Sequence, residues 1–136
     1  MILGIGTDLV DVRRIEKSIE RFSARFINRI FTESERSTAA AFQQPHFYFA
    51  KRFAAKEAVF KALSRSGVCG LGWHQAETRS LQNGAPIMYL TGQCKTALEA
   101  MTPDGYKAQV SISLSDEPPY ALAFVTINAV LLKLDN

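Results

Sequence analysis

The segment covering residues 47–63 constrains the fold most strongly, because it carries two helical stripes of different side-chain size. One side of the expected helix, at about 100° per residue, holds large side chains: Phe49, Phe53, Lys56, Phe60 and Leu63. A second strip holds only small ones: Ala50, Ala54, Ala58 and Ala62. A strip of small residues lets another backbone segment pack close to the helix. The pattern predicts a helix over about 47–63 whose phenylalanines pack in the core.

Residues 2–9, with the sequence ILGIGTDL, have the β-branched and glycine-rich composition of a short strand. Alternation places four residues on one face: Ile2, Gly4, Gly6 and Asp8. Because the two glycines leave that face bare, another backbone or a ligand can approach Asp8 closely. The stretch lacks the third glycine and the leading strand of a dinucleotide-binding fingerprint. Close backbone packing is therefore the interpretation.

The remaining patterns predict an α+β domain. A helix is expected after Asp11, a good N-cap, with one apolar stripe running as far as Ile30. A second helix is expected over about 34–42, capped by Thr32 or Ser34. Asn83-Gly84 predicts a hairpin, 92–101 a short helix, and 109–115 and 120–132 two further strands. The length of 136 residues favours a single domain over 1–136, with N-terminal helices packed on a small, mainly antiparallel sheet.

The composition excludes several classes of protein. A net charge of +3 is too small to argue for nucleic acid, although basic residues gather over 13–36 and favour an acidic partner. The alternative for that segment is a solvated helix face. The two cysteines form neither a disulfide framework nor a zinc pattern. Because no signal peptide or membrane-spanning stretch is seen, a cytoplasmic location with no membrane partner is expected.

Two carboxylates on separate elements, Asp8 and Glu57, are candidates for binding one hard cation. Mg²⁺ is usually held by one or two carboxylates together with waters and substrate phosphates. Spacing alone leaves a second interpretation open, in which Glu57 and Lys61 form an ordinary ion pair one helical turn apart.

Two sequence blocks together resemble the holo-acyl-carrier-protein synthases, small members of the 4'-phosphopantetheinyl transferase superfamily. They are GIGTDLVDVRRIE near the start and KRFAAKEAVFKAL about forty residues later, and a weaker match continues through NGAP, SISLSDE and YALA. The resemblance implies the fold of that superfamily and an Mg²⁺-dependent enzyme. This enzyme moves the phosphopantetheine arm of coenzyme A to a serine of an apo acyl carrier protein and releases 3',5'-ADP. The carrier would serve fatty acid biosynthesis or a secondary pathway.

The resemblance also implies roles for individual residues. Asp8 and Glu57 would bind the metal, while Lys61 would contact the phosphates and assist proton transfer, which makes Glu57 and Lys61 the expected catalytic residues. The base for the serine is either Glu57 or a metal-bound water. Contacts to coenzyme A are expected from Asp8, Arg52, Lys61, Arg65 and Ser111.

The family is typically trimeric, with active sites built across subunit boundaries, so a homotrimer is expected. Its first helix receives the acidic carrier protein. By position, the resemblance implies that the carrier protein is bound by Arg14, Arg21 and Arg25, with Phe22 and Phe26 as apolar contacts.

The sequence departs from the family pattern at three places. Many relatives carry a histidine where this chain aligns Ser111, with Gln109 nearby. The glycine-rich loop after the catalytic helix is SRSG, whose Arg65 is either a phosphate ligand or an ordinary loop residue. The usual Gly-Lys-Pro is GAP, so one lysine is missing.

Two other functions compete with the transferase. One is an Mg²⁺-dependent phosphodiesterase or nuclease, although such sites commonly place Glu and Lys two residues apart on a strand. Here Glu57 and Lys61 are four residues apart on an expected helix. The other is a non-catalytic basic module that only docks acidic proteins.

Overall fold

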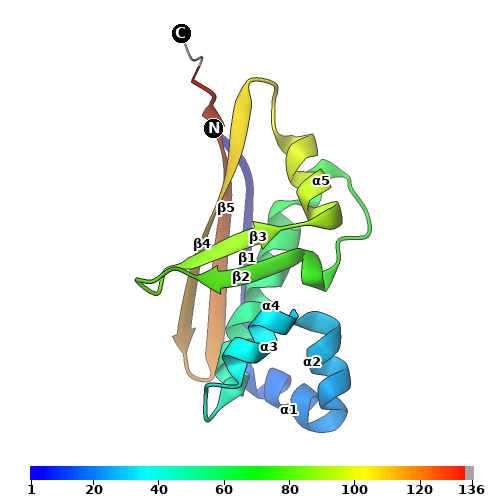
Figure 1. Cartoon of the computed structure of the whole chain (residues 1–136), viewed down its shortest axis with the longest axis vertical. Helices are drawn as coiled ribbons and strands as arrows, with labels where there is room; N and C mark the ends of the chain where they lie inside the picture. The colour runs from blue at the N-terminus through cyan, green and yellow to red at the C-terminus, as the bar shows by residue number, and fades with distance from the viewer. Residues whose placement is uncertain (134–136) are drawn as a thin grey trace.

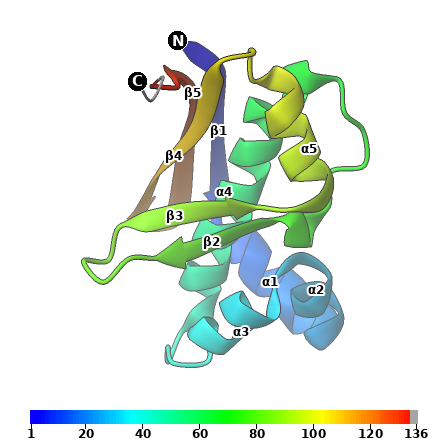
Figure 2. The same cartoon turned by 45° about the horizontal axis from the view of Figure 1, so that its top comes forward.

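Helix α4 (Pro45–Ala62) is the central element, and the other elements are arranged around it (Figure 1). The computed structural model describes residues 1–133. On one side α4 packs against a three-stranded antiparallel sheet of order β1-β5-β4, made of β1 (Ile2–Asp11), β5 (Tyr120–Leu131) and β4 (Tyr106–Glu117). On another side lies a separate hairpin of β2 (Ala76–Ser80) and β3 (Pro86–Leu90) (Figures 1 and 2). The α+β fold is confirmed.

Three short helices gather at one end of α4, at the bottom of Figure 1. They are α1 (Val12–Phe22), α2 (Ala24–Ile30) and α3 (Glu33–Ala39). Asp11 caps α1 as expected, since its carboxylate accepts a hydrogen bond from the backbone N–H of Arg13 at 3.0 Å. The expectation of one continuous stripe is wrong, because the backbone of Ser23 takes a φ of +47° and divides the segment into two helices.

The bounds of the other helices and strands agree closely with those predicted from the sequence. Helix α5 (Gly92–Met101) and the hairpin appear where they were expected, and Thr32 rather than Ser34 caps α3. Helix α3 ends at Ala39, short of the predicted 42, and α4 begins two residues earlier than predicted because Pro45 is accommodated in its first turn. Single-turn 3₁₀ helices lie at Ser64–Ser66 and Trp73–Gln75. No helix within residues 1–133 has both the length and the apolar content to cross a bilayer.

The glycines of β1 lie directly on the alanine strip of α4. A Cβ atom added to Gly6 would fall 1.8 Å from the carbonyl oxygen of Ala58, and one added to Gly4 would fall 2.2 Å from that of Ala62. Real Cβ atoms do not approach an oxygen this closely, so only glycine fits at either position. Close backbone packing is therefore confirmed for the bare strand face and for the small-residue helix strip. The structure adds that these two surfaces meet each other, which brings the following residues of β1 against α4.

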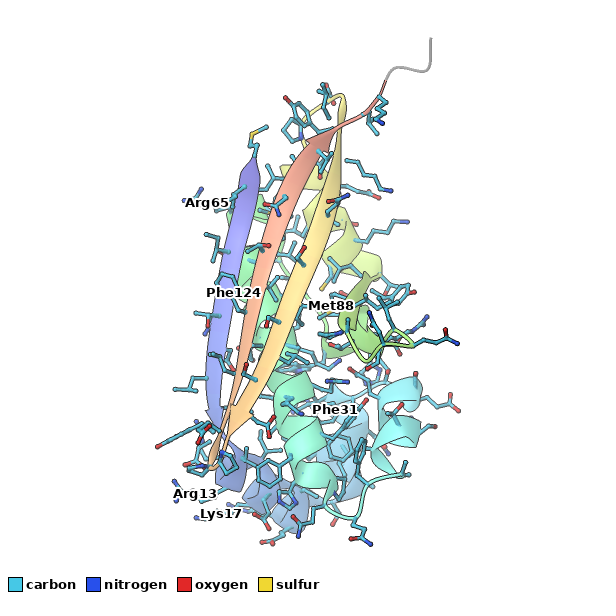
Figure 3. All side chains as sticks on the ribbon, turned by 90° about the vertical axis from the view of Figure 1, so that its left-hand side faces the viewer. Arg13, Lys17, Phe31, Arg65, Met88 and Phe124 are labelled. Atoms are coloured by element: carbon cyan, nitrogen blue, oxygen red, sulfur yellow. The ribbon has the colours of Figure 1, made fainter. Side chains whose placement is uncertain are left out.

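The two faces of the main sheet have opposite surroundings. The face toward α4 is buried and includes Ala121, Ala123, Val125 and Ile127 of β5. The other face carries apolar side chains that are 40–64% exposed: Ile5, Leu9, Leu122 and Phe124. Figure 3 looks onto this face, with α4 behind the sheet. Within residues 1–133 no element covers the outer face of the sheet.

Candidate active site

The end of α4 and the middle of β1 meet through Lys61 and Asp8. The Lys61 ammonium lies 3.1 Å from Oδ1 of Asp8 and donates to the backbone carbonyl of Thr7 at 2.8 Å. Among the described residues no ion pair joins Lys61 to Glu57, so the ordinary pairing along the helix is not formed. Lys61 instead connects the helix to the strand.

Glu57 lies one helical turn before Lys61 and is half-buried. Burial is the main cause that raises the pKa of Glu57 above its usual value, and the negative charge of Asp8 is the second, while Lys61 lowers it. The two carboxylates are thus near enough to repel one another. The structure brings Asp8, Glu57 and Lys61 into one place, which we call the carboxylate site.

The carboxylate site has the donors of a magnesium site rather than of a zinc site. Within residues 1–133 no group of three or more His, Cys, Asp and Glu side chains gathers to enclose an ion. Two carboxylates suffice for Mg²⁺, which keeps several waters and takes further oxygen ligands from substrate phosphates. A cation between Asp8 and Glu57 would also offset the repulsion that raises the pKa of Glu57.

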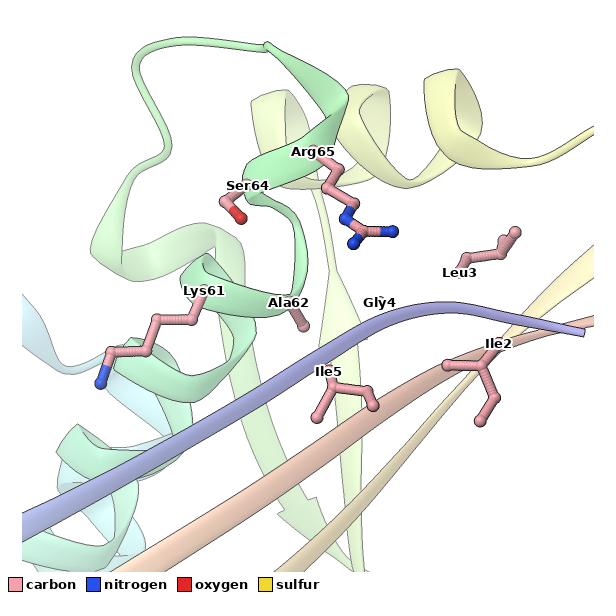
Figure 4. Close-up of a pocket in the computed structure, with 8 residues that line it drawn as sticks. All are labelled: Ile2, Leu3, Gly4, Ile5, Lys61, Ala62, Ser64 and Arg65. Carbon is pink, nitrogen blue, oxygen red and sulfur yellow. The ribbon is translucent and has the colours of Figure 1, made fainter.

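A cavity of about 190 Å³ lies beside Lys61, between the start of β1 and the end of α4 (Figure 4). Its wall combines two basic residues with aliphatic and small residues: Ile2, Leu3, Gly4, Ile5, Lys61, Ala62, Ser64 and Arg65. Arg65 comes from the 3₁₀ turn that follows α4, and its side chain is exposed. The placement of Arg65 and Lys61 on one cavity suits an anionic ligand.

Arg52 lies away from the carboxylate site, although the resemblance implied that it contacts coenzyme A. Its side chain is buried against the β2–β3 hairpin, with the guanidinium 4.6 Å from the ring centre of Tyr48 and 3.4 Å from Oγ of Ser80. Nine residues along a helix correspond to about two and a half turns, so Arg52 and Lys61 leave α4 on opposite sides. Within one chain, Arg52 does not join the carboxylate site.

Ser111 also lies apart from Asp8 in a single chain. It is exposed on β4 and pairs with Thr126 of β5, on the face of the sheet that points away from α4. Its neighbours along the strand, Ser113 and Ser115, are exposed on the same face. The sheet itself therefore separates Ser111 from the carboxylate site of its own chain.

The residues expected to receive a partner protein lie together on α1 and α2. A hollow of about 400 Å³ is lined by Phe22, Arg25, Phe26 and Arg29. A second, of about 270 Å³, contains Arg14 and shares Phe26 with the first. The guanidinium of Arg21 lies 5.1 Å from the ring centre of Phe22. No ion pair within residues 1–133 involves Arg14, Arg21 or Arg25, so their charges are available to an acidic surface.

Sequence reasoning missed one buried polar pair on the side of α4 that faces away from β1. Lys56, which was placed on the phenylalanine side of the helix, is fully buried and pairs with Glu35 at 2.7 Å. The signal was present in the T-E-S-E stretch, since a threonine followed three residues later by glutamate is typical of a capping box. Such a box holds the Glu35 carboxylate close to the start of α3, but the pattern does not reveal which lysine it meets.

Comparison with known proteins identifies the family. Residues 4–125 match the family model of the 4'-phosphopantetheinyl transferase superfamily. A holo-[acyl-carrier-protein] synthase of Jannaschia sp. (strain CCS1) is 46% identical over 96% of this chain and 87% of its own. The holo-[acyl-carrier-protein] synthase of Neisseria meningitidis superposes with a TM-score of 0.74 at 33% identity, over 94% of this chain and 99% of that one. The holo-[acyl-carrier-protein] synthase of Helicobacter pylori, solved in complex with coenzyme A, superposes with a TM-score of 0.73 at 26% identity, over 91% of this chain and 99% of that one. The chain belongs to the 4'-phosphopantetheinyl transferase superfamily, among the holo-[acyl-carrier-protein] synthases.

Proposed function

We propose that Asp8 and Glu57 hold a magnesium ion while this chain carries out the reaction of its family. That reaction transfers the 4'-phosphopantetheine group of coenzyme A to a serine hydroxyl of an apo acyl carrier protein and releases 3',5'-ADP. The observation that carries the proposal is the meeting of Asp8, Glu57 and Lys61 beside a cavity with two cationic side chains. The coenzyme A in the H. pylori relative supports the choice of substrate.

The chemistry requires charge neutralisation and alignment more than a nucleophile from this chain. The serine oxygen of the carrier attacks the β-phosphorus of the pyrophosphate, and the bond from that phosphorus to the bridging oxygen of 3',5'-ADP breaks. When bound, Mg²⁺ would supply neutralisation of the pyrophosphate charge. Lys61 holds the Asp8 carboxylate in place and has a third donor left for a phosphate oxygen. Arg65 would bind a phosphate from the cavity wall.

The serine proton needs an acceptor near the reacting oxygen. Glu57 is the candidate acceptor among the residues of this chain, because its carboxylate lies at the carboxylate site beside Asp8 and one helical turn from Lys61. A water on the metal is the alternative acceptor. The nuclease interpretation receives no support, because Glu57 and Lys61 lie on helix α4 rather than on a strand.

A complete site would combine residues of neighbouring copies in a homotrimer. Two observations support assembly through the outer face of the main sheet. That face exposes a contiguous apolar surface, and surfaces of this kind commonly mark interfaces. Ser111 lies on the same face and cannot reach the Asp8 of its own chain, so its expected contact with coenzyme A would be made to a substrate bound on a neighbour. The number of three copies comes from the family resemblance.

The surface of α1 and α2 would receive the acidic carrier protein. Arg14, Arg21 and Arg25 would attract its charge, and the hollow between Phe22 and Phe26 would take an apolar side chain. A carrier from fatty acid biosynthesis and a cytoplasmic location remain predictions from the sequence.

Incubation with coenzyme A, Mg²⁺ and an apo carrier protein tests the proposed function, followed by mass spectrometry of the carrier. We expect the carrier to gain one phosphopantetheine, and to gain none after the protein and reagents are treated with a chelator. Asp8→Asn and Glu57→Gln should each remove most of the activity, whereas Glu99→Gln, an exposed acid on α5, serves as the matched control. Transfer at the wild-type rate in Asp8→Asn or Glu57→Gln would overturn the metal assignment.

A further inference from the structure

A buried ion pair joins α4 to the start of α3. Lys56 and Glu35 are both shielded from solvent, and the Lys56 ammonium lies 2.7 Å from Oε1 of Glu35. The ammonium also donates to the backbone carbonyls of Trp73 at 2.9 Å and Ala76 at 2.8 Å. These contacts use all three of its donors. The three bonds therefore connect Lys56 to α3 and to the segment that enters the hairpin.

The Glu35 carboxylate is held just as firmly. Its Oε1 accepts from the backbone N–H of Thr32 at 2.9 Å, and its Oε2 accepts from the backbone N–H of Thr78 at 3.4 Å. Through this pair α4 is tied to the first turn of α3 and to the segment that enters the hairpin. The hydroxyl of Thr32 adds a bond to Glu77 at 2.6 Å.

Stability alone gives a weak reason for placing charges here. Two ions lose their hydration on burial, and an apolar pair of similar volume often stabilises a protein as well or better. Directional hydrogen bonds, unlike apolar contacts, specify one arrangement of the helices and strands that they join. Helix α4 needs such a constraint, since it has buried residues on nearly every side and the packing of its middle on β1 is made by glycines and alanines, with Lys61 adding polar bonds to β1 only near the end of the helix.

The pair lies on the side of α4 that is opposite the strand contact. Two residues along a helix correspond to about 200° of rotation, so the side chains of Lys56 and Ala58 point in nearly opposite directions, about 160° apart around the helix axis. Ala58 packs on Gly6 of β1, and Lys56 is tethered across the helix from it. Glu57 lies between Lys56 and Ala58 in sequence, so its side chain leaves the helix between the Lys56 bonds on one side and the Gly6 contact on the other. Fixing both sides fixes the rotation of α4 and the direction in which Glu57 faces Asp8.

We propose that Lys56 is a positioning residue, whose bonds to Glu35 and to the carbonyls of Trp73 and Ala76 set the rotation of α4 so that Glu57 meets Asp8. The inference deepens the proposed function and rests on it, because it concerns the two carboxylates that would share the metal. Residues that orient metal ligands from behind typically change metal affinity or activity about 10- to 100-fold when removed.

Binding of Mn²⁺ alone, measured by electron paramagnetic resonance, gives a readout that does not depend on turnover. Wild-type protein should bind one Mn²⁺, and absence of binding would overturn both the proposed function and this inference. Glu35→Gln/Lys56→Met removes both charges and the bonds to the carbonyls. We expect it to fold and to bind Mn²⁺ about tenfold more weakly. Its kcat for transfer should fall by a similar factor while the KM for the carrier stays within about twofold of wild type, since the carrier surface is not altered.

Ile30→Ala is the matched control, because it opens a cavity in the core without removing a bond of Lys56. It should lower the thermal midpoint and leave Mn²⁺ affinity unchanged. Should the double variant lack a cooperative unfolding transition, Glu35→Asp carries the test, because it keeps the buried charge paired while drawing the carboxylate back from Lys56, with an expected loss of about threefold in Mn²⁺ affinity. Wild-type Mn²⁺ affinity in a folded Glu35→Gln/Lys56→Met, or in Glu35→Asp, would refute the positioning role.

Discussion

Lys61 of α4 reaches across to β1 and places its ammonium 3.1 Å from Oδ1 of Asp8. Lys61→Met keeps the length of the side chain and removes its charge. We expect kcat for transfer to fall at least about 100-fold, because a donor aimed at the developing phosphate charge is lost. Mn²⁺ affinity should not fall, since a cation that competes for Asp8 has been removed. Lys51→Met, on the same helix, is the control for charge loss; a kcat of Lys61→Met equal to that of the control would contradict the role.

The raised pKa of Glu57 predicts how metal binding depends on pH. A cation requires the ionised carboxylate, so Mg²⁺ affinity should rise as pH increases through the raised pKa and should be weak below it. In the metal-free protein, protonation of Glu57 favours folding; this contribution is complete below the unfolded pKa and is lost as pH rises from there through the raised folded pKa. Carboxyl NMR titration of the metal-free protein measures the pKa directly. Asp8→Asn should move the pKa of Glu57 down; no movement would show that the two carboxylates do not interact.

The contact between Gly6 and Ala58 predicts a severe effect for one added methyl group. Gly6→Ala would place a Cβ 1.8 Å from a backbone carbonyl that cannot swing aside. The strand must separate from α4, and we expect the free energy of unfolding to fall by more than about 2 kcal/mol. Chemical denaturation followed by circular dichroism measures this change. Ser113→Ala, exposed on β4, should be close to neutral, and an equally small effect of Gly6→Ala would disprove the tight packing.

The exposed apolar face of the main sheet predicts the behaviour of Phe124→Glu. If copies of the chain assemble through this face, a buried carboxylate there costs several kcal/mol at each contact, and the protein should become monomeric. Analytical ultracentrifugation of wild type and variant measures the assembly. Leu81→Glu alters an exposed apolar residue of the hairpin turn and should leave assembly unchanged. A trimer that survives Phe124→Glu would place the interface elsewhere.

The arginines of α1 and α2 predict how carrier binding responds to salt. Arg14→Ala and Arg25→Ala should each weaken binding of an acidic carrier protein and flatten its dependence on ionic strength. Calorimetric titrations at low and high salt measure both effects. Lys95→Ala removes an exposed charge on α5, away from this surface, and should change neither. Equal carrier affinity in all three variants would count against the docking surface.

Local rules were enough to predict much of this structure. The alternation of β1, the cap at Asp11 and the Asn83-Gly84 turn each depend on residues close in sequence. The bare face of β1 and the alanine strip of α4 were each visible alone, but no local rule pairs surfaces so far apart in sequence. The break at Ser23 was not visible, because the apolar spacing continues across it and the left-handed φ of a serine leaves no mark in the pattern.

The residues of the candidate site also divide into those that local spacing could predict and those that it could not. Glu57 and Lys61 share one helix, so their proximity followed from their spacing, but Asp8 could be joined to them only by the family resemblance. The Lys56–Glu35 pair spans 21 residues, and spacing rules give no partner for a charge at such a distance. Arg52 and Ser111 show the limit of transfer by position, since the structure of one chain places both away from Asp8.

The pairing of β1 with β5 has a consequence for the order in which the molecule matures. Asp8 of β1 lies opposite Ala123 of β5, so all the other described helices and strands lie between these two strands in the sequence. Contacts that close so long a loop form late. Asp8 therefore gains its backbone partner late in folding, after the local helices have formed, and a change in β5 would affect the placement of a carboxylate that β5 does not carry.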